Sequence, residues 1–310
     1  VRDVITLESY RDNLLGEQTV IPRLLESFKK YEIHATFSTV GLLFFSSRKE
    51  MLENLPSRLP QYVNKRLSPY GSYMHENVGE DFKQDLFHFA PHLLQMIQEA
   101  PEQEIGTHTF SHYYCLEMGQ SIDDFREDIR MAIKIAAKEG IKITSIVFPR
   151  NQFNAAYLGV CKDLGIIAYR NNENSWIYSA KNGEEENLFR RMVRLTDAYL
   201  NISGHHCHEL QNLEYPVNIP SSRFLRPYSP SLRFLENLRM RRIKRAMTHA
   251  AKHRLLFHLW WHPHNFGINQ DENFAFLTQI LEHYLLLNKL YGFKSITMTN
   301  LAKKVLQNGT

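Results

Sequence analysis

The sequence has few cysteines, no long apolar run and no large excess of charge, and each shortage excludes a class of protein. Three cysteines in 310 residues, none in a CxxC pair, are too few for a disulfide framework, so we expect a reducing, cytoplasmic location. No apolar run is long enough to span a bilayer, and no segment resembles a signal peptide. A net charge of +4, with no nucleic-acid module, P-loop or dinucleotide fingerprint, argues against nucleic acid as a partner.

Strand-like and helix-like segments alternate along the chain. The residue pattern predicts strands at 34–41, 103–108, 143–149, 166–170, 254–261 and 293–299, and helices at 20–33, 86–100, 121–140, 154–165 and 272–287. Such alternation is typical of parallel βαβ units, and its repetition favours a (β/α) barrel over an open sheet. We therefore expect one α/β domain over residues 1–310, with insertions around 57–85 and 203–230 lying over the barrel face.

Two histidines, four residues apart, stand at the predicted end of a strand in "EIGTHTFSH". Neutral imidazoles bind zinc and similar metals, usually with a carboxylate or another histidine as a further ligand. The spacing alone is a weak signal that favours a solvated or hydrogen-bonded pair, but the position after a strand makes ligation a stronger interpretation, because barrel enzymes collect their chemistry at the C-terminal ends of strands. A zincin motif is excluded, since Thr109 stands where its glutamate would be.

The segments "IHATFSTVG" and "EIGTHTFSH" together resemble the polysaccharide deacetylase family, also called the NodB-homology or carbohydrate esterase 4 group. "FPRNQFN" stands where that family has its arginine motif, and "LLFHLWWHPHNFG" stands where it has a late strand ending in a histidine. The resemblance covers most of the chain. It implies an irregular (β/α)7-type barrel and metal-dependent hydrolysis of an N- or O-acyl group on a sugar.

The resemblance also implies roles for individual residues. His108 and His112 would bind a divalent transition metal, with zinc expected, and His262 would be the general acid. Arg150 would be the motif arginine that orients the base, although its motif is rearranged, which leaves Asn151 or Gln152 as alternatives pointing into the site. Further substrate-binding candidates are Trp176, His206, Trp261 and His264, and His264 competes with His262 for the acid role.

One family feature has no counterpart here. The family's first strand ends in a pair of acids that supply the catalytic base and the third metal ligand, and nothing in this sequence matches it. We expect that strand, and its acids, upstream of Val1, so that this chain lacks the first strand of the barrel. The alternative is that Asp3 reaches the metal in a variant arrangement.

The predicted function is removal of an N-acyl group from a sugar in polysaccharide or glycoconjugate biosynthesis. The rearranged arginine motif and the missing acids motivate an alternative, a non-catalytic carbohydrate-binding barrel; a zinc peptidase is more distant. The substrate is left open between polymer, nucleotide-linked and lipid-linked glycans. The basic stretch 223–254 is either a solvated outer helix or a surface attracting phosphate groups, including those of an anionic membrane.

Overall fold

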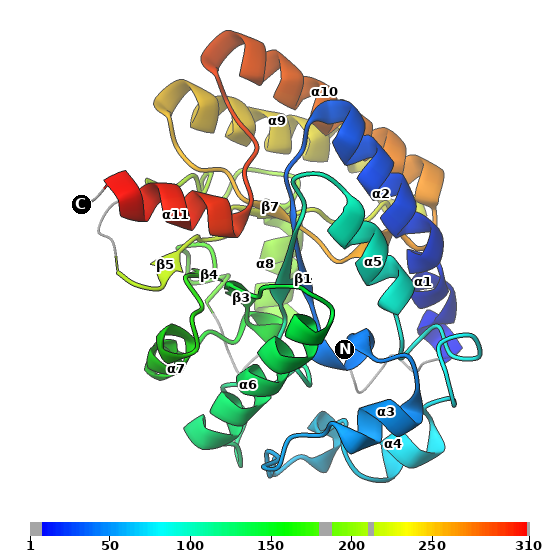
Figure 1. Cartoon of the computed structure of the whole chain (residues 1–310). Coiled ribbons are helices and arrows are strands. Elements are labelled where there is room, and N and C mark those ends of the chain that lie inside the picture. The colour runs from blue at the N-terminus through cyan, green and yellow to red at the C-terminus, as the bar shows by residue number, and fades with distance from the viewer. Residues whose placement is uncertain (1–7, 180–187, 210–213, 309–310) are drawn as a thin grey trace.

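The computed structural model describes residues 8–179, 188–209 and 214–308, and in them seven short strands form two parallel sheets (Figure 1). The first sheet contains, in order, β1 (Thr36–Thr39), β2 (Glu104–Thr107), β3 (Ser145–Val147), β4 (Ala168–Arg170) and β5 (Val217–Asn218). The second contains β6 (Arg223–Phe224) and β7 (Leu259–Trp260). Every strand pairing is parallel, which confirms the predicted α/β fold.

Helices surround the strands. They are α1 (Arg11–Leu15), α2 (Glu17–Tyr31), α3 (Arg48–Glu53), α4 (Ser72–Glu76), α5 (Pro91–Glu99), α6 (Ile122–Lys138), α7 (Leu158–Asp163), α8 (Leu188–Asp197), α9 (Glu236–His253), α10 (Gln270–Tyr291) and α11 (Met298–Asn308). One apolar cluster joins β2, β3 and β4 to α5, α6 and α7, and a second joins α2, α9 and α10. None of the helices in the described ranges is long and apolar enough to cross a membrane.

Helix α6 shows how the sequence sets an element and its position. Ser121 caps it, because the Ser121 hydroxyl accepts from the Asp124 amide while the Asp124 carboxylate accepts from the Ser121 amide. Its inner face buries Phe125 and Ile129 completely, and Gly140 ends it in a left-handed conformation with φ of 71°. The helix therefore begins and ends where the sequence predicts.

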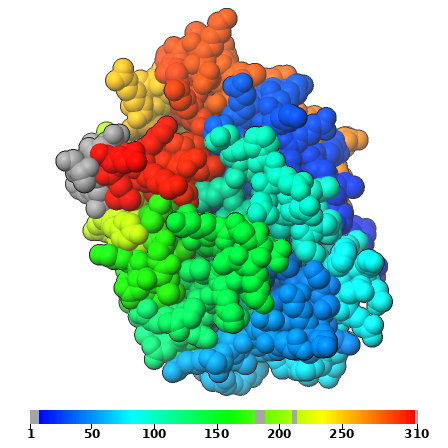
Figure 2. Space-filling model, viewed as in Figure 1, coloured from blue at the N-terminus to red at the C-terminus, as the bar shows by residue number. Residues whose placement is uncertain are grey.

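The predicted strand at 293–299 is wrong, because α11 begins at Met298 and the preceding residues join neither sheet. Glu104, the first residue of β2, accepts hydrogen bonds from the Thr299 amide at 3.0 Å and the Thr299 hydroxyl at 2.6 Å. A carboxylate at the first turn stabilises a helix start. These contacts, with a hydrogen bond of 3.0 Å from the Met298 amide to the Thr36 hydroxyl, hold α11 against segments from the first and middle thirds of the chain (Figure 2).

Two other predicted segments also differ. Residues 203–230 are not simply an insertion, because they contribute β5 and β6 to the two sheets. These strands are two residues long and separated by Pro220, so no alternating pattern predicts them. The helix predicted over 86–100 begins only at Pro91, which occupies the first turn, where its missing amide hydrogen costs nothing.

Residues 57–85 carry α4 and lie against the loop that follows β2. Tyr62 and Leu67 form a small buried cluster with Tyr114, and the Tyr62 hydroxyl accepts from the Tyr114 amide at 2.8 Å. This segment therefore supports the loop that carries the histidine pair.

The strands β1 and β7 are each paired on one side only within the described residues. All their residues are partly exposed, whereas β3 is buried throughout. Phe28 of α2 contacts both Phe37 of β1, at 6.2 Å between ring centres, and Trp261 just after β7, at 6.3 Å. Helix α2 thus contacts residues at or beside both of these open strand edges.

The turn that follows β7, Pro263–Phe266, is held to the N-terminal helices by close backbone contact. The Asn13 side-chain amide donates to the His264 carbonyl at 3.0 Å. A Cβ on Gly267 would lie 2.0 Å from the Asn13 carbonyl oxygen, and a Cβ on Gly16 would lie 2.3 Å from Gly267. These contacts fix the turn that carries His264.

Replacing Gly267 with alanine should therefore destabilise the protein. Overpacking against backbone atoms costs about 1–3 kcal/mol, and we expect the free energy of unfolding to fall by about that amount. Gly159→Ala is the matched control, because Gly159 lies in α7 with nothing within 4 Å of its Cβ position. The control should be neutral or stabilising by up to about 1 kcal/mol. Denaturant unfolding of both variants checks this, and equal effects would contradict it.

Candidate functional site

The histidine pair lies on the loop that follows β2, at the C-terminal end of the first sheet. The His108 amide donates to the Thr39 carbonyl at 2.8 Å, so the loop begins as a continuation of the β1–β2 pairing. Thr109 and His112 then adopt left-handed conformations, with φ of 66° and 59°. Residues other than glycine seldom adopt this backbone conformation, and residues strained in this way cluster at functional sites.

The two imidazoles are neighbours and differently oriented. Their ring centres are 4.9 Å apart and their planes are inclined by 69°. His108 Nδ1 lies 2.8 Å from the Val147 carbonyl oxygen, and because a carbonyl only accepts, Nδ1 carries the hydrogen and Nε2 the lone pair. Metal-binding histidines commonly donate the hydrogen of their other ring nitrogen to an acceptor in this way.

The protonation state of His108 also suits a metal ligand. Burial lowers its pKa well below 6.5, and the neighbouring His112 and Arg170 lower it further. A neutral imidazole with a free lone pair is the form that binds zinc. The pair therefore fits as two ligands of a transition metal.

A third protein ligand is not found in the part of the chain that the structure describes, where no three His, Cys, Asp or Glu side chains converge as a metal site. Asp3, the alternative carboxylate, lies outside the described residues. Zinc binding and the source of the third ligand therefore stay predictions.

Asp128 holds the histidine loop, and the sequence analysis missed it. It is 1% exposed on the inner face of α6, and its carboxylate accepts from the Phe110 amide at 2.6 Å, the Ser111 amide at 3.2 Å and the Ser111 hydroxyl. Burial raises its pKa to about 7, while these hydrogen bonds lower it. An acid on the apolar face of a predicted helix was the signal that could have found it.

Replacing Asp128 with alanine would leave two buried amides and a hydroxyl without an acceptor. We expect the free energy of unfolding to fall by about 2–4 kcal/mol, since each unsatisfied buried group costs about 1–3 kcal/mol. Asp163→Ala is the control, because that carboxylate is 58% exposed and pairs with Arg126 at the surface. It should change stability by less than about 1 kcal/mol. Similar losses in the two variants, measured by denaturant unfolding, would refute the assigned role.

The arginine motif forms a second strained turn, directly after β3. Arg150 and Asn151 have φ of 53° and 54°. The Arg150 guanidinium lies 3.6 Å from a Glu117 carboxylate oxygen and packs on the Tyr114 ring at 4.6 Å. Gln152 is 1% exposed and donates to Glu117 at 2.8 Å, so it supports the loop. Arg150 and Asn151, and not Gln152, line a cavity.

Arg170 closes β4 and is a second residue that the sequence analysis missed. It donates to the Asn151 side-chain oxygen at 2.5 Å, and its guanidinium lies 4.1 Å from the centre of the Trp260 ring. Burial lowers its pKa to about 10, and Glu173 raises it. A basic residue ending a buried strand, in "IIAYR", was the available signal.

His262 and His264 follow β7 and stack on each other, with ring centres 5.0 Å apart and planes inclined by 10°. Burial, with smaller contributions from His264, His108 and Arg170, lowers the pKa of His262 to about 3. His264 Nδ1 lies 3.5 Å from a Glu17 carboxylate oxygen. His262 is therefore neutral as it stands, and a general-acid role requires a carboxylate or substrate contact that raises its pKa.

The remaining candidates lie in three different places. Trp176 is 62% exposed at the surface. His206 Nε2 lies 2.7 Å from the Ser203 hydroxyl, and its ring meets Tyr178 edge-on. Trp261 packs in the apolar layer against Phe266, whereas its neighbour Trp260 lines the cavity. Of the two tryptophans, Trp260 thus lines the cavity and Trp261 does not.

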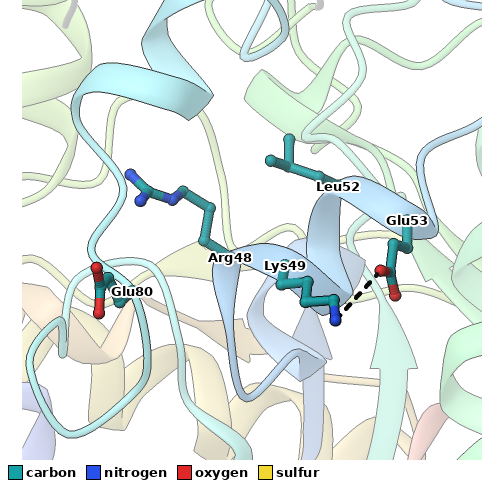
Figure 3. A pocket seen from close by; sticks show the side chains of 5 residues that line it. All are labelled: Arg48, Lys49, Leu52, Glu53 and Glu80. Atoms are coloured by element: carbon teal, nitrogen blue, oxygen red, sulfur yellow. Dashed lines mark ion pairs between the residues drawn. The ribbon is translucent and has the colours of Figure 1, made fainter.

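The cavity beside these residues has a volume of about 280 Å³. Its walls are Arg150, Asn151, Glu173, Tyr178, Ser179, Arg194, Ala198, Arg223, Phe224, Arg226 and Trp260. A larger hollow of about 550 Å³ lies against α3, where Arg48, Lys49, Leu52, Glu53 and Glu80 line it (Figure 3). Its charges are mixed, and Lys49 pairs with Glu53 at 4.0 Å, so it offers no comparable chemistry.

Comparison with known proteins identifies the family and the fold of the chain. Residues 12–169, just over half of the chain, match the family described as Polysaccharide deacetylase. A putative polysaccharide deacetylase from Mycobacterium smegmatis has a similar fold, with 14% identity and a TM-score of 0.55 over 95% of this chain and 79% of that one. A CE4 family pseudoenzyme from Bacillus anthracis is 14% identical, with a TM-score of 0.42 over 93% of this chain and 61% of that one. No curated protein matches.

Proposed function

Because the chain belongs to the polysaccharide deacetylase family, we propose that it removes an N-acyl group from a sugar with the help of a divalent transition metal, expected to be zinc. The observation that carries the proposal is the pair His108 and His112, with the His108 Nδ1 hydrogen fixed on a backbone carbonyl and its Nε2 left to bind. That the substrate is an acylated sugar, and that the reaction belongs to polysaccharide or glycoconjugate synthesis, is proposed from the family alone.

A metal bound by this pair would polarise the acyl carbonyl and lower the pKa of a bound water. The chain's own residues then hold and orient the substrate. Trp260 offers its ring to the sugar, and His262, 5.7 Å from Trp260 between ring centres, stands where a proton can be given to the leaving amine. Asp128 keeps the histidine loop in the strained shape that makes the two imidazoles neighbours.

The catalytic base would be a carboxylate from outside the described residues. Two sources fit: Asp3, or a strand preceding Val1 that pairs in the interval between β1 and β7. A carboxylate on such a strand would also raise the pKa of His262, since an opposite charge favours the protonated imidazole.

The second candidate is a carbohydrate-binding barrel without catalysis. The observation in its favour is that the described residues bring no carboxylate to the histidine pair. In that case glycan affinity would persist in His112→Ala while no acyl group is released from any substrate.

The experiment is an acetate-release assay on the full-length protein, loaded with zinc, against N-acetylated oligosaccharides and sugar phosphates. The proposal predicts release that stops on chelation and returns when metal is added. Glycan binding without release favours the binding barrel, and cleavage of a generic peptide substrate would favour a peptidase instead.

A further inference from the structure

The cavity beside the histidine site has an unusual balance of charge. Four arginines line it, Arg150, Arg194, Arg223 and Arg226, against a single acid, Glu173. We call it the arginine pocket. Its residues come from the loop after β3, from α8 and from the β6 region, which the chain brings together from distant positions.

Two of these arginines have carboxylate partners. Arg223 lies 2.7 Å from Asp197, and both side chains are almost completely buried. Arg150 lies 3.6 Å from Glu117. Their charges are largely balanced within the protein.

Arg226 differs. It is half-buried, and its guanidinium makes no hydrogen bond or ion pair with any residue of the described chain. Burial lowers its pKa, and among its neighbours Tyr199 raises it while Arg239 lowers it. Because a guanidinium stays charged in proteins, the pocket holds a cation that the described residues leave uncompensated. Burying such a charge is costly unless a ligand pairs with it.

The arginine pocket adjoins the histidine site through shared aromatic walls. Phe224 and Trp260 line the pocket, with ring centres 4.7 Å apart. Both rings also face His262, at 6.3 Å and 5.7 Å between ring centres. A sugar lying on Trp260 would therefore have one end near the histidines and the other near Arg226.

We propose that the arginine pocket binds a phosphate group of the substrate, so that the acylated sugar is phosphate-linked. This rests on the proposed function, because it names the substrate of the same site. Guanidinium groups bind phosphate through paired hydrogen bonds, and a phosphate carries more charge than a carboxylate to offset the excess. A nucleotide-linked and a lipid-linked sugar share this chemistry.

The test is calorimetric titration of the zinc-loaded, full-length protein with inorganic pyrophosphate. Arg226→Gln should weaken binding about 10- to 100-fold, the usual loss for hydrogen bonds to a charged group. Arg191→Gln is the matched control, since Arg191 is exposed on α8 and does not line the pocket. It should leave the affinity unchanged. The Tm of Arg226→Gln should not fall substantially, because no hydrogen bond or ion pair of its guanidinium within the described chain is lost.

Further arms separate the alternatives. Pyrophosphate binding that persists in His112→Ala supports the pocket, whereas binding that disappears there assigns the anion to the metal. Glucuronate binding as tightly as pyrophosphate would overturn the phosphate assignment, as would equal affinity in Arg226→Gln. Competition by a UDP-linked sugar or a polyprenyl-diphosphate sugar then identifies the source. Arg226-dependent binding without acetate release would refute the deacetylase function and support the phosphate pocket. Acetate release from neutral glycans alone would support the deacetylase function and refute the phosphate pocket.

Discussion

His112→Ala should lose both bound metal and activity. The two imidazoles are the ligands that the proposal assigns to the metal, and removing one leaves a single imidazole that cannot hold the ion. Metal content measured after dialysis should fall to background, and acyl release should become undetectable. His75→Ala is the control, because His75 is an exposed histidine on α4 that is not one of the assigned ligands.

The same variant should fold. His112 stands in a loop held by Asp128 and by Tyr62, and those contacts do not involve its ring. An unfolding midpoint equal to that of the metal-free wild type therefore separates ligation from structural damage, because a bound metal itself stabilises the folded state. Full metal content in His112→Ala would show that the ion is bound elsewhere.

His262→Ala should lower kcat by about 10²–10⁴, the usual contribution of general acid–base catalysis, and leave metal content intact. The ring lies beside Trp260 and His264, on the turn that the contacts of Gly267 hold in place. The pKa of His262 is low in the free protein, and a general acid must be protonated, so a partner has to raise this pKa in the active complex. Wild-type activity should then fall as the pH rises through the raised pKa, and His262→Ala should lack this fall.

His264→Ala is the matched comparison, because His264 stacks on His262 and lies near Glu17. Full activity in His262→Ala with loss in His264→Ala would move the acid role to His264. Full activity in both variants would refute the mechanism proposed for this turn.

The sequence predicted the elements whose pattern is strong. Helix α6 carries a capping box and an apolar face, and the strand before His108 ends where its glycine and histidine indicate. Strands β5 and β6 were missed because two residues beside prolines give no periodic signal. The segment 293–299 has strand-like residues, but the Glu104 carboxylate accepts a hydrogen bond from the Thr299 amide, and a helix begins there instead of a strand.

The residues of the candidate site likewise fall into those that the sequence indicated and those that only the folded structure reveals. His108 and His112 were proposed as ligands from a motif that resembles the family's, and they lie close together because they stand on one loop. Arg170 and Arg226 become site residues only through tertiary packing, which brings β4, β6 and β7 to one end of the fold. No local pattern marks a lone arginine as facing a cavity.

The most direct test of the central claim is an anomalous diffraction map of crystals of the full-length protein grown with zinc. The account predicts one strong peak about 2.0–2.1 Å from a nitrogen of His108 and from a nitrogen of His112, with a carboxylate from outside the described residues as a further ligand. An absent peak, or a peak that neither imidazole reaches, would contradict it.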